Sequence, residues 1–320
     1  MAAAHAVDSG VPSNESAIAA RLGYAFLALA ALTYCLIVLG ALVRAHGAGL
    51  ACPDWPLCFG EVIPEFDFKV AFEWGHRALA GTVGLLFAAL AFLTLRRPSL
   101  RGAMRVGLVV AAFLLAAQIV LGGLTVLQLL AYWTVTSHLV TGNAFALALV
   151  LLGRRLLAIS RPDESRLEAD PATAPDDSLV STATGLAGFL LVIQVILGGL
   201  VSSNYAGLAC PDWPTCIDGE FFPTWSGIRG LHLFHRVTGY ATAIALFGAA
   251  WATRRDPRLR PWFGTAALLV LAQLIVGILN VLWRVPVEIT GLHSALAAGL
   301  ICTVGVGVYE VWLGDRRLFR

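Results

Sequence analysis

Long apolar stretches separated by short polar ones dominate this chain. A helix needs about 20 residues to cross a bilayer, and eight stretches approach that length: roughly residues 22–43, 72–95, 106–128, 133–153, 179–202, 230–252, 262–283 and 287–313. The pattern predicts an all-α membrane protein with eight transmembrane helices. Because no basic region precedes the first stretch, we expect a retained helix there rather than a cleaved signal peptide.

Composition supports a membrane protein. Of the 320 residues, 58% are hydrophobic and only 13% are charged, whereas roughly a quarter of the residues in soluble domains are charged. The formal net charge is +2, and no basic cluster with interleaved aromatic residues is present. We therefore expect the lipid bilayer, and no nucleic acid, as a partner.

Arginines are concentrated in alternate connections of the predicted helices. They follow the second, fourth, sixth and eighth stretches, at Arg96, Arg97, Arg101, Arg105, Arg154, Arg155, Arg161, Arg166, Arg254, Arg255, Arg258, Arg260, Arg316, Arg317 and Arg320. Basic connections stay in the cytoplasm. The sequence therefore predicts a multi-pass protein of the cell membrane with both termini cytoplasmic.

The chain contains an internal duplication. The motif Cys-Pro-Asp-Trp-Pro-x-Cys occurs at 52–58 and again at 210–216, in the two predicted outer loops that follow helices one and five, which indicates two similar halves. We expect two pseudo-symmetric four-helix bundles, the N-terminal one over 22–156 and the C-terminal one over 179–313. A proline-containing acidic linker, 157–178, joins them, and cytoplasmic tails, 1–21 and 314–320, flank them.

A smaller repeat lies inside each half. Every even helix carries a histidine near its outer start, at His76, His138, His235 and His293. The preceding odd helices carry a related pattern, namely Cys35-x4-Gly40, Gln118-x3-Gly122, Gln194-x3-Gly198 and Gln273-x3-Gly277. A glycine also follows each histidine, at Gly81, Gly142, Gly239 and Gly299. We expect these small residues to let a helix or a flat ligand approach closely.

The four histidines favour a haem protein. A single intramembrane histidine is more often a helix contact than a ligand, but four at one depth, one on each even helix, favour ligands. Two imidazoles from separate helices of a bundle suit the two axial positions of a haem iron. A zinc site needs three or four clustered ligands, and the spacing provides no such cluster.

The halves differ beside their first histidines. The first half reads Glu73-x-x-His76-Arg77, and the second has His232 in place of Glu73. Polar groups in hydrocarbon by default mark function, so we interpret Glu73 as the candidate catalytic group of a reacting site; the alternative is that it only pairs with Arg77. Arg77 and its counterpart Arg236 either extend to the lipid headgroups or bind haem propionates.

The outer loops contain the cysteine pairs. If the predicted orientation is right, the loops are in an oxidising compartment, and we expect the disulfides Cys52–Cys58 and Cys210–Cys216. A structural loop clamp is one role for these bonds. A redox-active pair is the other, because a short exposed disulfide can be labile.

Taken together, these features resemble the haem A synthase family, whose members oxidise a ring methyl of haem O to the formyl group of haem A for cytochrome oxidase. The likeness covers residues 22–313 and rests on the two bundles, the ordered histidines, the Glu73-x-x-His76-Arg77 block and the loop cysteines. It implies haem b held by His235 and His293. Haem O, and then haem A, would lie between His76 and His138, beside an essential Glu73.

The resemblance also implies partners and leaves some roles open. The enzyme that makes haem O, a farnesyltransferase, and an electron acceptor become expected partners, and the haem sites would lie toward the outer side. Many family members carry a cysteine pair in one half or in neither, so the role of each pair here stays open. The family assigns no catalytic role to His232.

Three other functions compete with this hypothesis. The first is a dihaem electron carrier or quinol oxidoreductase subunit without haem-modifying chemistry. The second is a thiol–disulfide redox protein that uses the loop cysteines, although Cys-x-x-Cys is absent. The third is a transporter built from repeats, which would not need four histidines at one depth.

Overall fold

Long helices make up the computed structural model, which describes residues 13–161 and 177–314. In chain order they are α1 (Ser13–Ala45), α2 (Phe68–Leu95), α3 (Pro98–Leu127), α4 (Tyr132–Ser160), α6 (Asp177–Ser203), α7 (Gly227–Thr253), α8 (Arg260–Leu282) and α9 (Val287–Tyr309), with a short helix η2 (Ala206–Leu208) after α6 and a final turn η3 (Glu310–Gly314). These eight long helices are the predicted ones. Residues 162–176 of the expected linker and most of both expected tails lie outside the described ranges.

Several helices extend beyond the apolar stretches that predicted them. The helix α1 begins at Ser13, inside the expected tail, where Glu15 bonds Ser99 and lies 3.9 Å from Arg97. The helix α2 begins earlier because Asp67 caps it, accepting the Val70 N–H at 2.8 Å. In α2, helical hydrogen bonding therefore continues into the polar border, where the Asp67 side chain satisfies a free N–H group of the first turn.

Among the described residues, seven helices are long and apolar enough to cross a membrane, and α7 is the remaining long helix. The helix α7 is less apolar because it carries His232 and His235 together with Arg229 and Arg236. It packs against α6 and α8 like its neighbours. The chain is therefore a multi-pass membrane protein, as the sequence predicts.

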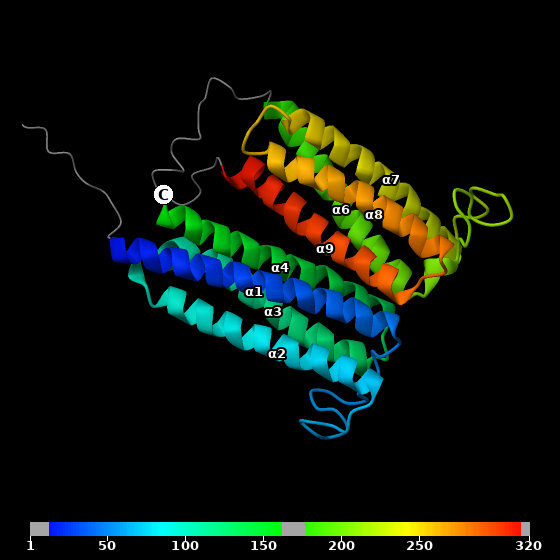
Figure 1. Cartoon of the computed structure of the whole chain (residues 1–320), viewed down its shortest axis with the longest axis horizontal. Helices are drawn as coiled ribbons and strands as arrows, with labels where there is room; N and C mark the ends of the chain where they lie inside the picture. Colours follow the sequence, from blue (N-terminus) through cyan, green and yellow to red (C-terminus); the bar gives the residue numbers. More distant parts are fainter. Residues whose placement is uncertain (1–12, 162–176, 315–320) are drawn as a thin grey trace, which may run out of the picture.

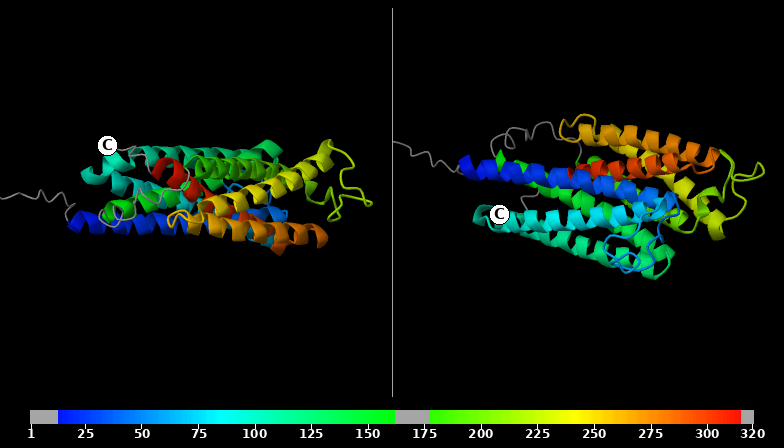
Figure 2. Two further views of the ribbon diagram at one scale, coloured as in Figure 1. Left: turned by 90° about the horizontal axis from the view of Figure 1, so that it is seen from above. Right: turned by 60° about the horizontal axis from the view of Figure 1, so that its bottom comes forward.

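The helices gather into two groups with separate apolar cores. Figures 1 and 2 show α1–α4 on one side and α6–α9 on the other. One core cluster contains Phe26, Phe87 and Leu149 from the first group, and another contains Leu246, Phe263 and Val304 from the second. The groups meet where α1 and α4 pack against α9 and α6. There, the Tyr34 hydroxyl donates to the carbonyl of Ala295 at 2.9 Å.

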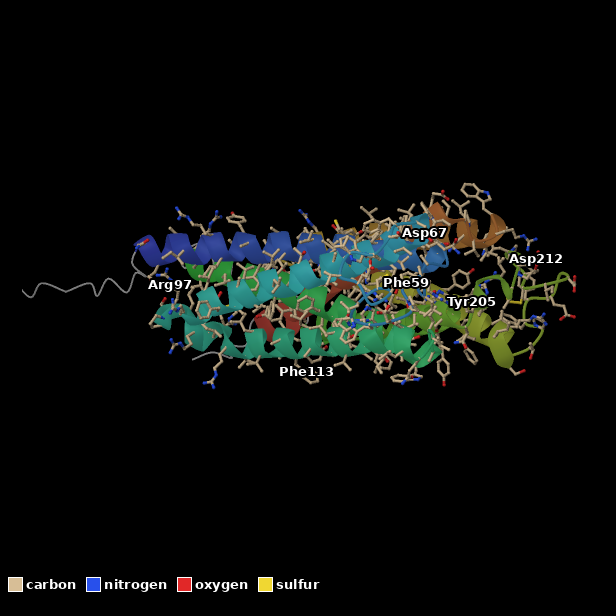
Figure 3. All side chains as sticks on the ribbon, turned by 90° about the horizontal axis from the view of Figure 1, so that it is seen from below. Phe59, Asp67, Arg97, Phe113, Tyr205 and Asp212 are labelled. Carbon is tan, nitrogen blue, oxygen red and sulfur yellow. A yellow bond between two sulfur atoms is a disulfide. The ribbon has the colours of Figure 1, made fainter. Side chains whose placement is uncertain are left out.

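The two cysteine loops lie at one end of the molecule, past the ends of α1 and α6 (Figure 1). Figure 3 shows Asp67 and Asp212 toward this end and Arg97 at the opposite end. This separation is the one expected when basic connections and cysteine loops lie on opposite sides of a bilayer. Which side is cytoplasmic remains a prediction from the arginine distribution.

Candidate histidine sites and the disulfide loops beside them

Each of the four intramembrane histidines packs against a glycine of the preceding helix. A methyl group added to Gly40 would lie 3.0 Å from Cε1 of His76. The matching distances are 3.3 Å for Gly122 and His138, 3.1 Å for Gly198 and His235, and 3.2 Å for Gly277 and His293. A side chain at any of these four glycine positions would therefore push against the imidazole ring. The glycines of α1, α3, α6 and α8 thus set the position of the histidines.

The expected close approach at the other glycines occurs in only two of four places. Added methyl groups on Gly142 and Gly239 would meet Gln118 and Gln194 at 3.1 and 3.0 Å, but on Gly81 and Gly299 they would meet nothing within 4 Å. The residue four positions after His76 and after His293 is an alanine, whereas after His138 and His235 it is the glycine itself. Approach of a flat ligand to Gly81 and Gly299 stays a prediction.

The histidines form one pair in each half. His76 lies close enough to His138 to interact with it electrostatically, and the same holds for His235 and His293. Each ring is partly buried. In all four, Nδ1 is enclosed and has no hydrogen-bond partner among the described residues. Buried polar atoms are almost always bonded, so the four unpartnered Nδ1 atoms mark sites that a ligand is expected to complete.

Three helices that precede a histidine-bearing helix, namely α3, α6 and α8, carry a glutamine that bonds to it. Gln118 donates through Nε2 to the carbonyl of His138 at 2.9 Å, and Gln194 accepts from Thr238 at 2.6 Å. Nε2 of Gln273 lies 3.2 Å from Nε2 of His293. The residue four before Gly40 is Leu36. The hairpin of His76 therefore lacks the amide side chain that the other three hairpins carry at this position.

Both predicted disulfides are present. Cys52 bonds Cys58, and Cys210 bonds Cys216. Each bond is buried in a small apolar cluster at the base of its loop, with Val70 in the first half and Leu233 in the second. In the first loop the Asp54 carboxylate also accepts backbone N–H groups of Phe59 and Gly60, at 2.6 and 2.9 Å. The Gly60 N–H bond, followed by that of Phe59, lowers the pKa of Asp54 below its usual 3.8.

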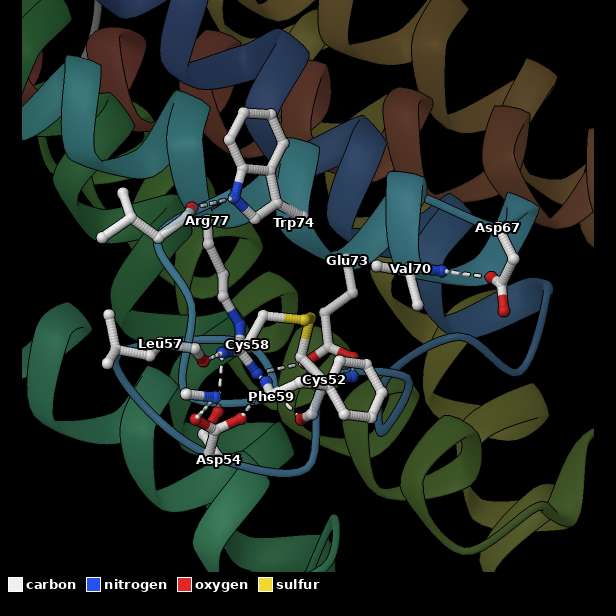
Figure 4. The surroundings of a disulfide bond; sticks show 12 residues. Cys52, Asp54, Leu57, Cys58, Phe59, Asp67, Val70, Glu73, Trp74 and Arg77 are labelled. Carbon is white, nitrogen blue, oxygen red and sulfur yellow. Dashed lines mark hydrogen bonds and ion pairs between the residues drawn. A yellow bond between two sulfur atoms is a disulfide. The ribbon is translucent and has the colours of Figure 1, made fainter. Parts of the chain in front are cut away.

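Glu73 and Arg77 anchor the first loop to α2 (Figure 4). The buried Glu73 carboxylate accepts the backbone N–H of Cys52 at 2.8 Å and a guanidinium N–H of Arg77 at 2.5 Å. Arg77 in turn donates to the carbonyls of Asp54 at 2.7 Å and Leu57 at 2.6 Å. A charge-assisted network of this kind fixes the loop to the helix.

The second loop is anchored in the same way, with His232 in place of Glu73. The buried His232 ring faces the Cys210 N–H through Nδ1 at 3.4 Å, and Arg236 through Nε2 at 3.2 Å. Arg236 donates to the carbonyls of Asp212 at 2.9 Å and Thr215 at 3.0 Å. The sequence analysis considered this pairing only for Glu73 and Arg77, although the same four-residue spacing separates His232 from Arg236.

The structure gives both arginines loop carbonyls as partners, which neither sequence-based expectation had named. Binding of haem propionates by Arg77 and Arg236 stays a prediction. The residues of each histidine pair fit a haem because two neutral imidazoles from separate helices, in an apolar site, are the donor set of a bis-histidine iron.

Comparison with known proteins gives consistent results. The chain matches the family described as Cytochrome oxidase assembly protein over residues 24–71 and 63–304. It is similar to a protein named Heme A synthase from Symbiobacterium thermophilum, with 31% identity over 85% of this chain and 90% of the relative. Proteins of the same name from Paracoccus denitrificans and Shewanella oneidensis are 30% and 29% identical; the matches cover 93% and 88% of this chain, and 88% and 93% of the relatives.

Proposed function

The chain belongs to the cytochrome oxidase assembly protein family, and on this premise we propose that it is a haem A synthase, which oxidises a ring methyl of haem O to the formyl group of haem A. The observation that carries the proposal is the fourfold contact between a histidine and a glycine of the preceding helix, together with the lack of a hydrogen-bond partner for Nδ1 of each of these histidines among the described residues. Named relatives that align over most of the chain support it.

We assign a different task to each half. His235 and His293 hold a haem b cofactor, which supplies one-electron transfer when bound. His76 and His138 hold the substrate, haem O, and later the product. Two features support this order: a carboxylate, Glu73, lies three residues before the first histidine of the first half, where the second half has His232, and Leu36 replaces the glutamine of the other hairpins. An apolar neighbourhood suits a substrate that carries a long hydrocarbon tail.

The reaction requires an electron outlet. Conversion of a methyl group and one water to a formyl group releases four protons and four electrons, so each turnover needs an acceptor for both. A carboxylate close to the substrate can accept protons if it is partly desolvated. Glu73 is 4% exposed and is our candidate for this task. Each of its two oxygens accepts one N–H group, from Arg77 or from Cys52, and keeps a second lone pair that can hold a proton.

The remaining contacts place the chain's own residues around this chemistry. The disulfide loops cover the outer ends of the helices that carry His76 and His235, and Arg77 and Arg236 hold these loops in place. Exclusion of water by such covers protects reactive intermediates. The farnesyltransferase that makes haem O is the expected supplier of substrate, and a membrane electron carrier is the expected acceptor.

A single experiment tests the function. The protein is expressed in cells that make haem O but have no haem A synthase of their own, and the extracted haems are separated by chromatography. Haem A in the extract supports the proposal. The similar histidine–glycine contacts of both halves favour one competing function, a dihaem electron carrier. An extract that contains haem b and unmodified haem O but no haem A would favour that carrier.

A further inference from the structure

The two loop tryptophans occupy equivalent places in the sequence but different places in the structure. Trp55 and Trp213 are the fourth residues of the two Cys-Pro-Asp-Trp-Pro-x-Cys motifs. Each is flanked by anchored carbonyls, because Arg77 bonds those of Asp54 and Leu57 and Arg236 bonds those of Asp212 and Thr215. The loop anchors are therefore alike, and any difference between the indoles arises from what they contact.

Trp55 reaches across the first helix group to α3. A methyl group added to Gly123 would lie 3.1 to 3.2 Å from three carbons of the Trp55 indole. The neighbouring Gly122 faces the ring of His138. A methyl group added to Gly122 would lie 3.3 Å from Cε1 of that ring. Adjacent residues of a helix differ by about 1.5 Å in height and by about 100° around the helix axis. The Trp55 indole and the His138 imidazole therefore cover adjoining parts of the same helix.

Trp213 is held at α7 instead. Its Nε1 donates to the hydroxyl of Tyr240 at 3.0 Å. The residue of α2 that corresponds to Tyr240 is Gly81, which offers no hydroxyl group. The residue of α8 that corresponds to Gly123 is Ile278, as judged from the matching His138 and His293 hairpins. In the first half, Gly81 therefore offers Trp55 no hydroxyl group on α2, and Gly123 leaves space for the indole on α3.

We infer that Trp55 is a wall residue of the His76–His138 site and positions the flat porphyrin ring of the substrate there. The inference rests on the proposed function, because it takes the site to hold haem O. Trp55 keeps 38% of its surface exposed, so part of the indole is available to a ligand while the rest is fixed against Gly123. A rigid aromatic face is well suited to a planar apolar ring. Trp213 has no such role in the other half.

The test compares Trp55→Ala with its matched control Trp213→Ala. Detergent-purified protein is titrated with haem O without an electron acceptor, and binding is followed by the change in the Soret band. Trp55→Ala should raise the dissociation constant for haem O about tenfold and raise KM more than it lowers kcat. Trp55→Phe should restore most of the affinity. Trp213→Ala should change the affinity by less than about twofold.

A second variant covers the case in which Trp55→Ala does not fold. Gly123→Ala adds the methyl group that would lie 3.1 Å from the indole and keeps a good helix former in α3. It should weaken haem O binding in the same direction as Trp55→Ala while leaving the haem b spectrum unchanged.

The outcomes separate this inference from the proposed function. Wild-type affinity for haem O in both Trp55→Ala and Gly123→Ala, or an equal loss in Trp213→Ala, would overturn the role of Trp55. Failure of the wild-type protein to make haem A contradicts the proposed function, whereas the haem O titration still measures the contribution of Trp55.

Discussion

Glu73 and His232 bond equivalent atoms in the two halves of the chain. Each faces the backbone N–H of the first cysteine of its loop, Cys52 or Cys210, and each faces the guanidinium of the arginine four residues later. The carboxylate accepts both of its N–H groups, whereas an uncharged imidazole has a single acceptor nitrogen and can take only one of the two that face it. An imidazole nevertheless holds one loop where a carboxylate holds the other. Loop anchoring alone does not require a negative charge at this position, which supports a further role for Glu73.

Replacement of Glu73 by glutamine tests that role. Glu73→Gln keeps the shape and one acceptor oxygen but removes the charge and the titratable proton. We expect normal content of both haems and haem A production below about a hundredth of the wild-type value, the scale of a lost general acid–base group. Haem content and haem A are measured on the same purified sample. Joint loss of haem binding and turnover would restrict Glu73 to anchoring its loop.

The matched change in the second half measures the cost of a weakened loop anchor. His232→Gln removes the imidazole that Arg236 and Cys210 share. Because we assign only the cofactor to this half, haem A production per folded molecule should stay within a few-fold of wild type. If His232→Gln abolishes haem A production while Glu73→Gln leaves it normal, the two halves have been assigned in the wrong order.

The disulfides should act mainly on stability. Both bonds are buried in apolar clusters at the loop bases, and removal of a native disulfide commonly costs about 2–5 kcal/mol. Replacement of all four cysteines by serine should therefore lower the yield or the thermal stability more than the turnover per folded molecule. Non-reducing peptide mapping of fresh protein should recover the pairs Cys52–Cys58 and Cys210–Cys216. A selective loss of turnover in stable, folded protein would instead support a redox role.

The first loop should loosen in acid. The backbone N–H groups of Gly60 and Phe59 hold the pKa of Asp54 below its ordinary value of 3.8. The Asp54 contribution to stability is therefore fully present above that ordinary value and is lost as the pH falls through the lowered one. We expect hydrogen-exchange protection of the Phe59 and Gly60 amides to fall in this acid range. Unchanged protection, or equal loss in Asp54→Asn, would show that the carboxylate does not hold the turn.

The sequence predicted the elements of the fold well because hydropathy and arginine placement follow directly from the bilayer. Eight apolar stretches became eight long helices, and the four histidines lie near the starts of α2, α4, α7 and α9. The repeated cysteine motif indicated both disulfides before any geometry was available. These features depend on local pattern or on exact repetition, which a single sequence contains.

Contacts between distant segments were not predictable in the same way. The partners of Arg77 are carbonyls that any residue carries, so no side chain in the loop indicates them. The glycines that contact histidines lie on the preceding helices, and helix register decides which glycine faces inward. The same register places Trp55 over Gly123 while Ile278 fills the matching position in the other half. Such differences become visible only when the helices are packed.

The division of labour between the halves is tested most directly by the haem content of two single variants. His76→Ala and His293→Ala are each expressed with haem O available, and the bound haems are extracted and separated by chromatography. We predict that His293→Ala loses haem b and its low-spin spectrum. His76→Ala should keep haem b but retain neither haem O nor haem A. Retention of haem b in His293→Ala together with its loss in His76→Ala would contradict the assignment.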